Sequence, residues 1–77
     1  MIIKILGAGC NNCRLLEDNA KKAVEELGLA ALVEKVTALK EITSYGVLRT
    51  PALVIDGDVK TMGRIPTVEE IKEYLPR

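Results

Sequence analysis

The stretch IIKILGAGCNNC, residues 2–13, decides the fold because it joins a strand pattern to a helix pattern through two cysteines. Residues 2–6 are rich in β-branched side chains and are expected to form a strand. A glycine-rich turn follows, and a helical pattern then continues to about Leu27. The sequence therefore places Cys10 and Cys13 where the first strand passes into the first helix.

The helical pattern predicts the direction in which the second cysteine points. Its apolar stripe consists of Leu16, Ala20, Ala23, Val24 and Leu27. Cys13 lies three residues before this stripe and should face the core, whereas Cys10 should lie at the exposed tip of the helix. The partial positive charge of a helix N-terminus stabilises a thiolate, and such settings lower a cysteine pKa from about 8.5 to roughly 3.5–7.5. We therefore expect Cys10 to attack a substrate disulfide and Cys13 to resolve the mixed disulfide that forms.

The remaining elements follow from turn and capping signals. Gly28 and Gly46 should each end a helix, Asp56-Gly57 is a two-residue hairpin turn, and Thr67 with Glu70 forms a capping box. We expect strands over residues 2–6, 31–37, 52–55 and 59–62. We expect a first helix that ends at about Leu27, a second over residues 39–45, and a third that starts at the Thr67 cap and is ended by Pro76. Val68, Ile71 and Leu75 should form the buried face of the third helix. The order β-α-β-α-β-β-α predicts an α/β fold with parallel strand pairs and helices on the sheet, as one domain over residues 1–77.

Composition excludes several classes of protein. Eleven basic and eleven acidic residues give a formal net charge of zero, and no basic stripe suggests nucleic acid. The apolar runs are far shorter than the roughly 20 residues that span a bilayer, so we expect no membrane association. The first residues carry no charged leader, so we expect no signal peptide and a cytoplasmic location.

Two other uses of the cysteine pair remain open from the residues alone. A structural disulfide would close only a very short loop, and such disulfides are rare in the cytosol. A structural zinc site needs four ligands, but this chain has two cysteines and no histidine, so we predict no zinc site. Two thiolates could still carry a soft metal such as copper(I).

The chain resembles a known family in the order of its elements and in four segments. These segments are GCNNC at residues 9–13, YGV at 45–47, RTPALVIDG at 49–57, and Gly63. In these, the chain resembles the thioredoxin/glutaredoxin superfamily, and within it the short prokaryotic proteins called small redox-active disulfide proteins. The resemblance implies a thioredoxin-like (minimal glutaredoxin-like) fold with a four-stranded mixed sheet and three helices. It also implies a thiol–disulfide oxidoreductase that acts as a disulfide reductase or electron carrier.

The resemblance also assigns residues and partners. It implies that Pro51 is cis, that the Thr50 backbone pairs with an extended substrate, and that Asn11 and Asn12 border the substrate. It implies no cofactor beyond a reversible Cys10–Cys13 disulfide. The expected substrate is a protein or small-molecule disulfide, and the expected electron donor is an external reductase. The protein itself is expected to be a monomer.

The chain departs from its better-known relatives near the cysteines. Typical thioredoxins have Trp before the first cysteine and Gly-Pro between the two, where this chain has Gly9 and Asn11-Asn12. After the hairpin, Arg64 could meet a substrate carboxylate or be a surface charge. Tyr45 could cover the site or pack at a helix end.

Two rival functions are a small copper carrier and a thioredoxin-like interaction domain whose cysteines are not turned over. The element after the second strand separates the first rival from a redox protein, because a helix there favours redox chemistry and an immediate hairpin favours metal transport.

Overall fold

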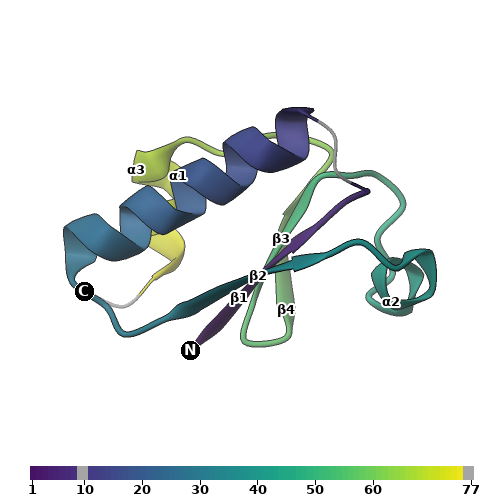
Figure 1. Ribbon diagram of the computed structural model, residues 1–77, viewed down its shortest axis with the longest axis horizontal. Coiled ribbons are helices and arrows are strands. Elements are labelled where there is room, and N and C mark those ends of the chain that lie inside the picture. Colours follow the sequence, from purple (N-terminus) through teal and green to yellow (C-terminus); the bar gives the residue numbers. More distant parts are fainter. Residues whose placement is uncertain (9–10, 76–77) are drawn as a thin grey trace.

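A computed structural model describes residues 1–8 and 11–75 and shows a mixed sheet covered on one face by two helices (Figure 1). The elements are β1 (Ile2–Leu6), α1 (Asn11–Leu27), β2 (Leu32–Val36), α2 (Leu39–Ser44), β3 (Ala52–Ile55), β4 (Asp58–Met62) and α3 (Val68–Tyr74). The strand order is β2-β1-β3-β4, with β1 and β2 parallel and the other two pairs antiparallel. The predicted element order and the four-stranded mixed sheet with three helices are therefore confirmed.

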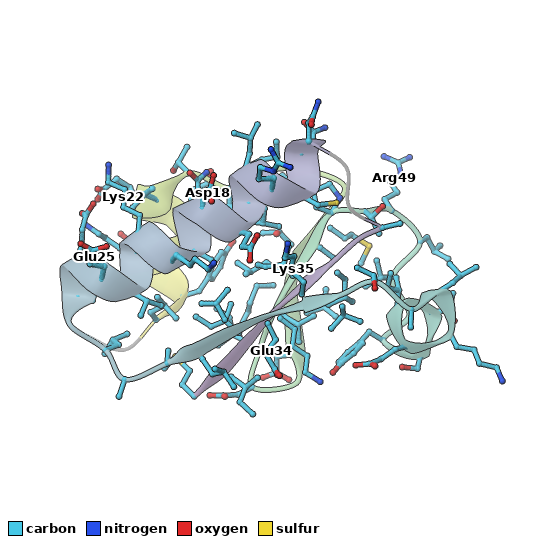
Figure 2. All side chains as sticks on the ribbon, in the orientation of Figure 1. Asp18, Lys22, Glu25, Glu34, Lys35 and Arg49 are labelled. Carbon is cyan, nitrogen blue, oxygen red and sulfur yellow. The ribbon has the colours of Figure 1, made fainter. Side chains whose placement is uncertain are left out.

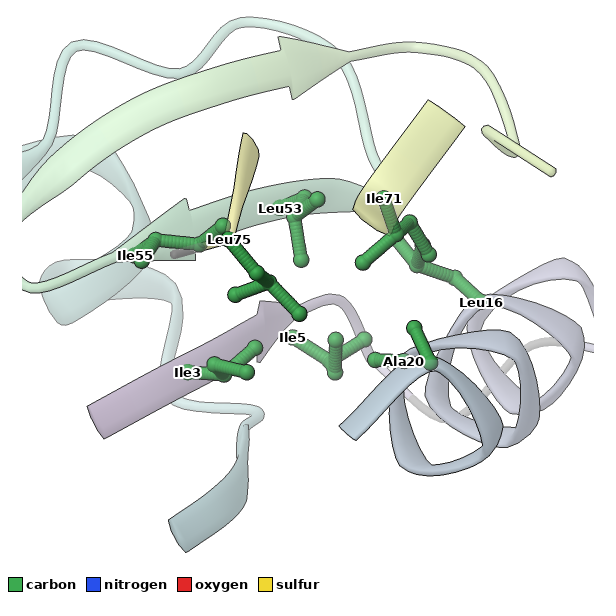
Figure 3. Packing of buried hydrophobic residues seen from close by; sticks show 9 residues of the cluster. Ile3, Ile5, Leu16, Ala20, Leu53, Ile55, Ile71 and Leu75 are labelled. Carbon is green, nitrogen blue, oxygen red and sulfur yellow. The ribbon is translucent and has the colours of Figure 1, made fainter. Parts of the chain in front are cut away.

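Helix α1 packs its apolar stripe onto the sheet and onto α3. Leu16, Ala20 and Ala23 are fully buried beside Ile3 and Ile5 of β1. Figure 3 shows Ala20 next to Ile5 of this strand and Leu16 next to Ile71 of α3, with Leu53 of β3 in the same cluster. Because this packing fixes the helix against the strand that precedes it, it also fixes the position of the first turn of α1.

The end of α1 is a Schellman motif, as the position of Gly28 predicts. Gly28 has a φ of +64°, and its N–H donates to Glu25 O at 3.1 Å. The N–H of Leu29 donates to Val24 O, also at 3.1 Å. These two bonds satisfy carbonyls that the helix end leaves free, and a glycine adopts the required left-handed conformation without strain.

Helix α2 lies near the end of the sheet at which β1 finishes, beside a second apolar cluster (Figure 1). Ile42 of α2 packs there with Leu6, Val36, Ala52 and Val54. The predicted helix over 39–45 ends one residue earlier, and Gly46 follows it with a φ of +75°. The presence of this helix directly after β2 meets the condition that favours a redox protein over a copper carrier.

Strand β2 is an edge strand with exposed Glu34 and Lys35, as its charged residues predict. It is shorter than the predicted 31–37, because its pairing with β1 covers only residues 32–36.

The C-terminal half follows the predicted turn and cap. Asp56 and Gly57 both have positive φ angles, +48° and +87°, which define the hairpin turn that twisted strands prefer. Strand β4 begins one residue earlier than expected, because Asp58 pairs with Ile55. Both hydrogen bonds of the capping box between Thr67 and Glu70 are present.

Leu75 and Ile71 are buried and Val68 is half-buried, so the inner face of α3 is as predicted. The predicted role of Pro76 in ending this helix lies outside the described residues.

Candidate active site at the start of helix α1

Cys13 lies in the first turn of α1 with only 4% of its surface exposed. Its inward orientation is the one that its place before the apolar stripe predicts. Its sulfur is part of a disulfide, and the chain has one other cysteine, Cys10. The predicted exposure of Cys10, which directly precedes the first residue of α1, lies outside the described residues. The described half of the pair is therefore a shielded sulfur at the start of a long helix.

The backbone of Gly7 lies directly against the sulfur of Cys13. This residue is buried at the end of β1, and its N–H donates to Val36 O of β2 at 2.9 Å. A Cβ at position 7 would collide with Cys13 Sγ and would lie 3.4 Å from Cys13 Cβ. Only a residue without a side chain lets the sulfur approach the strand this closely.

Thr50 lies on the other side of the same glycine. The position that a Cβ of Gly7 would occupy is 3.8 Å from Thr50 Cβ, so Cys13 and Thr50 both border this one backbone site. The Thr50–Pro51 peptide bond is cis, as the resemblance implied. Pro51 is buried and its carbonyl accepts a hydrogen bond from the N–H of Gly63 at 2.9 Å. The structure thus brings Cys13 and the bend at 50–51 together, although Thr50 lies 37 positions after Cys13 in the sequence.

Solvent reaches the residues around this buried sulfur. Asn11 and Asn12 are the first two residues of α1, and both are exposed. Thr50 is also exposed, so the buried Cys13 has exposed polar residues next to it, both before it in α1 and on the far side of Gly7. This arrangement suits a sulfur that reacts with a neighbouring sulfur and is screened from larger molecules.

Glu17 is a buried charge that sequence reasoning missed. It lies one helical turn after Cys13, so the two residues occupy the same side of α1. Its side chain is only 11% exposed and forms ion pairs with Lys21 at 3.2 Å and with Lys35 at 3.6 Å. The available signal was its spacing of four residues from Cys13, but an acidic residue at that spacing is ordinarily solvent-exposed.

Arg64 lies on the surface and forms an ion pair with Glu70 of the same chain. Its guanidinium contacts both carboxylate oxygens of Glu70, at 3.3 and 2.7 Å. This bidentate pair raises the pKa of Arg64 and, together with the hydrogen bond from the Thr67 backbone, holds the pKa of Glu70 below its ordinary value. Of the two uses predicted for Arg64, the structure therefore shows the surface ion pair.

Tyr45 packs at the C-terminal end of α2. It is half-buried against the second apolar cluster, and its hydroxyl accepts a hydrogen bond from Lys4 Nζ at 3.1 Å. The hydrogen bond to Tyr45 raises the pKa of Lys4. The packing interpretation of Tyr45 is therefore confirmed.

The described residues contain neither a cluster that could hold a metal ion nor a membrane-spanning helix. Among residues 1–8 and 11–75, no group of three or more His, Cys, Asp or Glu residues is arranged to hold a metal ion. In the same part of the chain, no helix combines the length and apolar character that crossing a bilayer requires.

Sequence comparisons agree with this geometry. Residues 1–76 match the family described as "Thioredoxin domain". A protein of Methanothermobacter thermautotrophicus named "Thioredoxin" is 47% identical over 75 residues, which cover 97% of each chain. A second "Thioredoxin", from Methanocaldococcus jannaschii, is also 47% identical over 75 residues, covering 97% of this chain and 86% of that protein.

A βαβαββα fold with a Cys-x-x-Cys motif at residues 10–13, a buried Cys13 in the first turn of α1 and a cis-proline bend near Cys13 defines a thioredoxin-like redox protein. The chain belongs to the thioredoxin family of thiol–disulfide oxidoreductases.

Proposed function

We propose that this protein reduces disulfide bonds with Cys10 as the attacking thiolate and Cys13 as the resolving thiol. The observation that supports these roles most directly is the burial of Cys13 under an exposed rim of Asn11, Asn12 and Thr50. A sulfur with 4% exposure cannot meet a substrate disulfide in line, but it can reach a sulfur one helical turn away. Cys10 directly precedes the helix and is the other cysteine of the chain, so we assign to it the first attack on the substrate disulfide.

The first step forms one S–S bond and breaks another. The Cys10 thiolate attacks one sulfur of the substrate disulfide, and the second substrate sulfur leaves as a thiolate that takes up a proton. The 17-residue helix α1 favours the reactive anion, because its N-terminal N–H groups and dipole stabilise negative charge close by.

The second step regenerates the free substrate. Cys13 loses its proton and attacks the sulfur of Cys10, the bond between Cys10 and the substrate breaks, and the remaining substrate sulfur leaves as a thiolate that takes up a proton. The substrate has then gained two electrons and two protons, and the protein holds a Cys10–Cys13 disulfide. An external reductase returns two electrons to this disulfide, because the protein's own chemistry stores only one pair.

Thr50 and Pro51 form the docking edge for the substrate. Thr50 is exposed beside Gly7 and Cys13, so an extended segment that pairs with the Thr50 backbone brings its sulfur to the cysteine pair. Asn11 and Asn12 border this segment on the helix side. The substrate that we propose is a disulfide in a protein or a small molecule. We also propose that this chain is a single domain that acts as a monomer in the cytoplasm.

A thiol redox titration combined with a turnover assay tests this function. The full chain should accelerate the reduction of insulin or a neutral disulfide peptide by dithiothreitol, with one two-electron transition in the titration. The variants Cys10→Ser and Cys13→Ser should each lose turnover. Thr67→Ser, in the distant capping box, serves as a control that keeps both cysteines and the capping hydroxyl. A wild-type rate equal to that of dithiothreitol alone would overturn the proposal.

A further inference from the structure

Two arginines lie next to the residues of the candidate active site. Arg14 directly follows Cys13, and Arg49 directly precedes Thr50. Both are exposed, and within the described residues neither belongs to an ion pair. Arg64, by contrast, is bound by Glu70. The guanidinium groups of Arg14 and Arg49 are therefore available to bind a ligand, whereas the charge of Arg64 is already balanced by Glu70.

The side chain of Arg49 rests on the chain that leaves β4. Its Cβ and Cδ both lie 3.0 Å from the position that a Cβ on Gly63 would take. Gly63 has a φ of +74° and donates its N–H to Pro51 O, so this backbone is tied to the bend at 50–51. Figure 2 shows the Arg49 side chain extending outward at the end of the molecule where α1 begins. The aliphatic stem is thus supported by backbone while the guanidinium faces solvent.

The segment that carries Arg49 contains no acidic residue to oppose its charge. Residues 42–55 hold no Asp or Glu, although the whole chain has eleven, whereas Arg14 has the exposed Asp18 one helical turn further along α1. The exposed side chain next to Arg49 is apolar, since Leu48 is 91% exposed. A chain with zero formal net charge therefore presents a locally cationic and partly apolar surface beside its reactive sulfurs.

We propose that Arg49, assisted by Arg14, selects protein disulfides whose cysteines are flanked by acidic residues. This inference rests on the proposed function and names the class of substrate. An extended segment paired with the Thr50 backbone carries its neighbouring side chains past residue 49, where a guanidinium can bind a carboxylate through two parallel hydrogen bonds. Arg14, exposed on α1 directly after Cys13, attracts the same segment as it approaches. Leu48 packs against an apolar residue of that segment.

Matched peptides test this selectivity on the full-length protein. Three peptides of one length carry the same disulfide, flanked on both sides by Glu, Gln or Lys, and the measured quantity is the second-order rate constant for their reduction. At low salt, the acidic peptide should react about tenfold faster than the basic one, and the ratio should fall as salt screens the charges. Oxidised glutathione is included as a small disulfide that also bears carboxylates.

Variants separate the specific arginine from general charge. Arg49→Gln should remove most of the acidic preference, measured as the ratio of the rate constants for the acidic and basic peptides, and Arg49→Lys should restore part of that ratio. Arg64→Gln, which removes an equal charge already bound by Glu70, should leave the ratio unchanged.

Several outcomes would overturn the inference while leaving the proposed function intact. One is an equal rate on all three peptides, and another is a preference that survives Arg49→Gln combined with Arg14→Gln. A third is a dependence on Arg49 seen with oxidised glutathione but not with the peptides. Failure to reduce even the neutral peptide would refute the proposed function itself.

Discussion

Gly7→Ala is the substitution whose effect the structure specifies most closely. The added methyl group would occupy the space of Cys13 Sγ in the disulfide form. Gly7 has no left-handed backbone conformation, so the substitution acts through this collision and not through backbone strain. Forcing a methyl group into a packed site costs about 1–3 kcal/mol. We expect the free energy of unfolding of the oxidised protein to fall by that amount.

The same collision should change the redox equilibrium. In the reduced protein, Cys13 Sγ can rotate away from the new methyl group, so the reduced form should lose less stability. A difference of 1.4 kcal/mol between the two forms corresponds to about 30 mV for a two-electron couple. The reduction potential should therefore rise by roughly 20–60 mV. Denaturant unfolding of each redox form and a thiol titration measure these two quantities.

Gly28→Ala is the matched control, because it makes the same chemical change where no atom lies within 4 Å. Its φ of +64° should cost about 1 kcal/mol in both redox forms and leave the potential unchanged. The reasoning fails if Gly7→Ala is as stable as the wild type when oxidised. It also fails if Gly7→Ala destabilises both redox forms equally.

Three further predictions concern stability away from the cysteines. Thr61 buries a hydroxyl for which the described residues provide no hydrogen-bond partner, so Thr61→Val should raise the free energy of unfolding by about 1 kcal/mol in denaturant titrations. Thr67→Ala removes the capping oxygen of α3 and should lower the midpoint of denaturation by the equivalent of about 1 kcal/mol. Because Arg64 lowers the folded-state pKa of Glu70, the stability from this pair is complete above the ordinary Glu pKa of 4.5 and is lost as the pH falls through the lower folded value. Thermal unfolding between pH 6 and 2 should thus be less pH-dependent in Glu70→Gln than in the wild type.

Features set by local pattern could be predicted from the sequence. The spacing of Leu16, Ala20 and Ala23 determines the buried face of α1, and that face in turn places Cys13 inside. Asp56-Gly57 forms its turn because both residues tolerate positive φ angles, and the Thr67–Glu70 box acts through hydrogen bonds within four residues, so both follow from the local sequence. Strand ends were off by one residue, because pairing with a neighbour decides where a strand stops.

Features that depend on contacts across the fold could not be predicted. The role of Gly7 requires knowing that Cys13 and Thr50 meet at one point of β1, and the sequence alone suggested only a turn. Glu17 is buried because Lys35 of β2 lies opposite it, a neighbour that helical periodicity does not reveal. Thr61 lies opposite Leu53 whereas Val59 lies opposite Val54, because the strand register shifts between Leu53 and Val54, and the alternation of residues in β4 does not reveal that shift.

The most direct test of the account is a trapping experiment that compares the two cysteines. Each of Cys10→Ser and Cys13→Ser is incubated with a disulfide peptide, and mass spectrometry under non-reducing conditions detects any covalent adduct. Cys13→Ser should accumulate a mixed disulfide through Cys10, whereas the buried thiol of Cys10→Ser should form almost none. An adduct on Cys13 but not on Cys10, from a protein whose wild type reduces the peptide, would contradict the assigned roles.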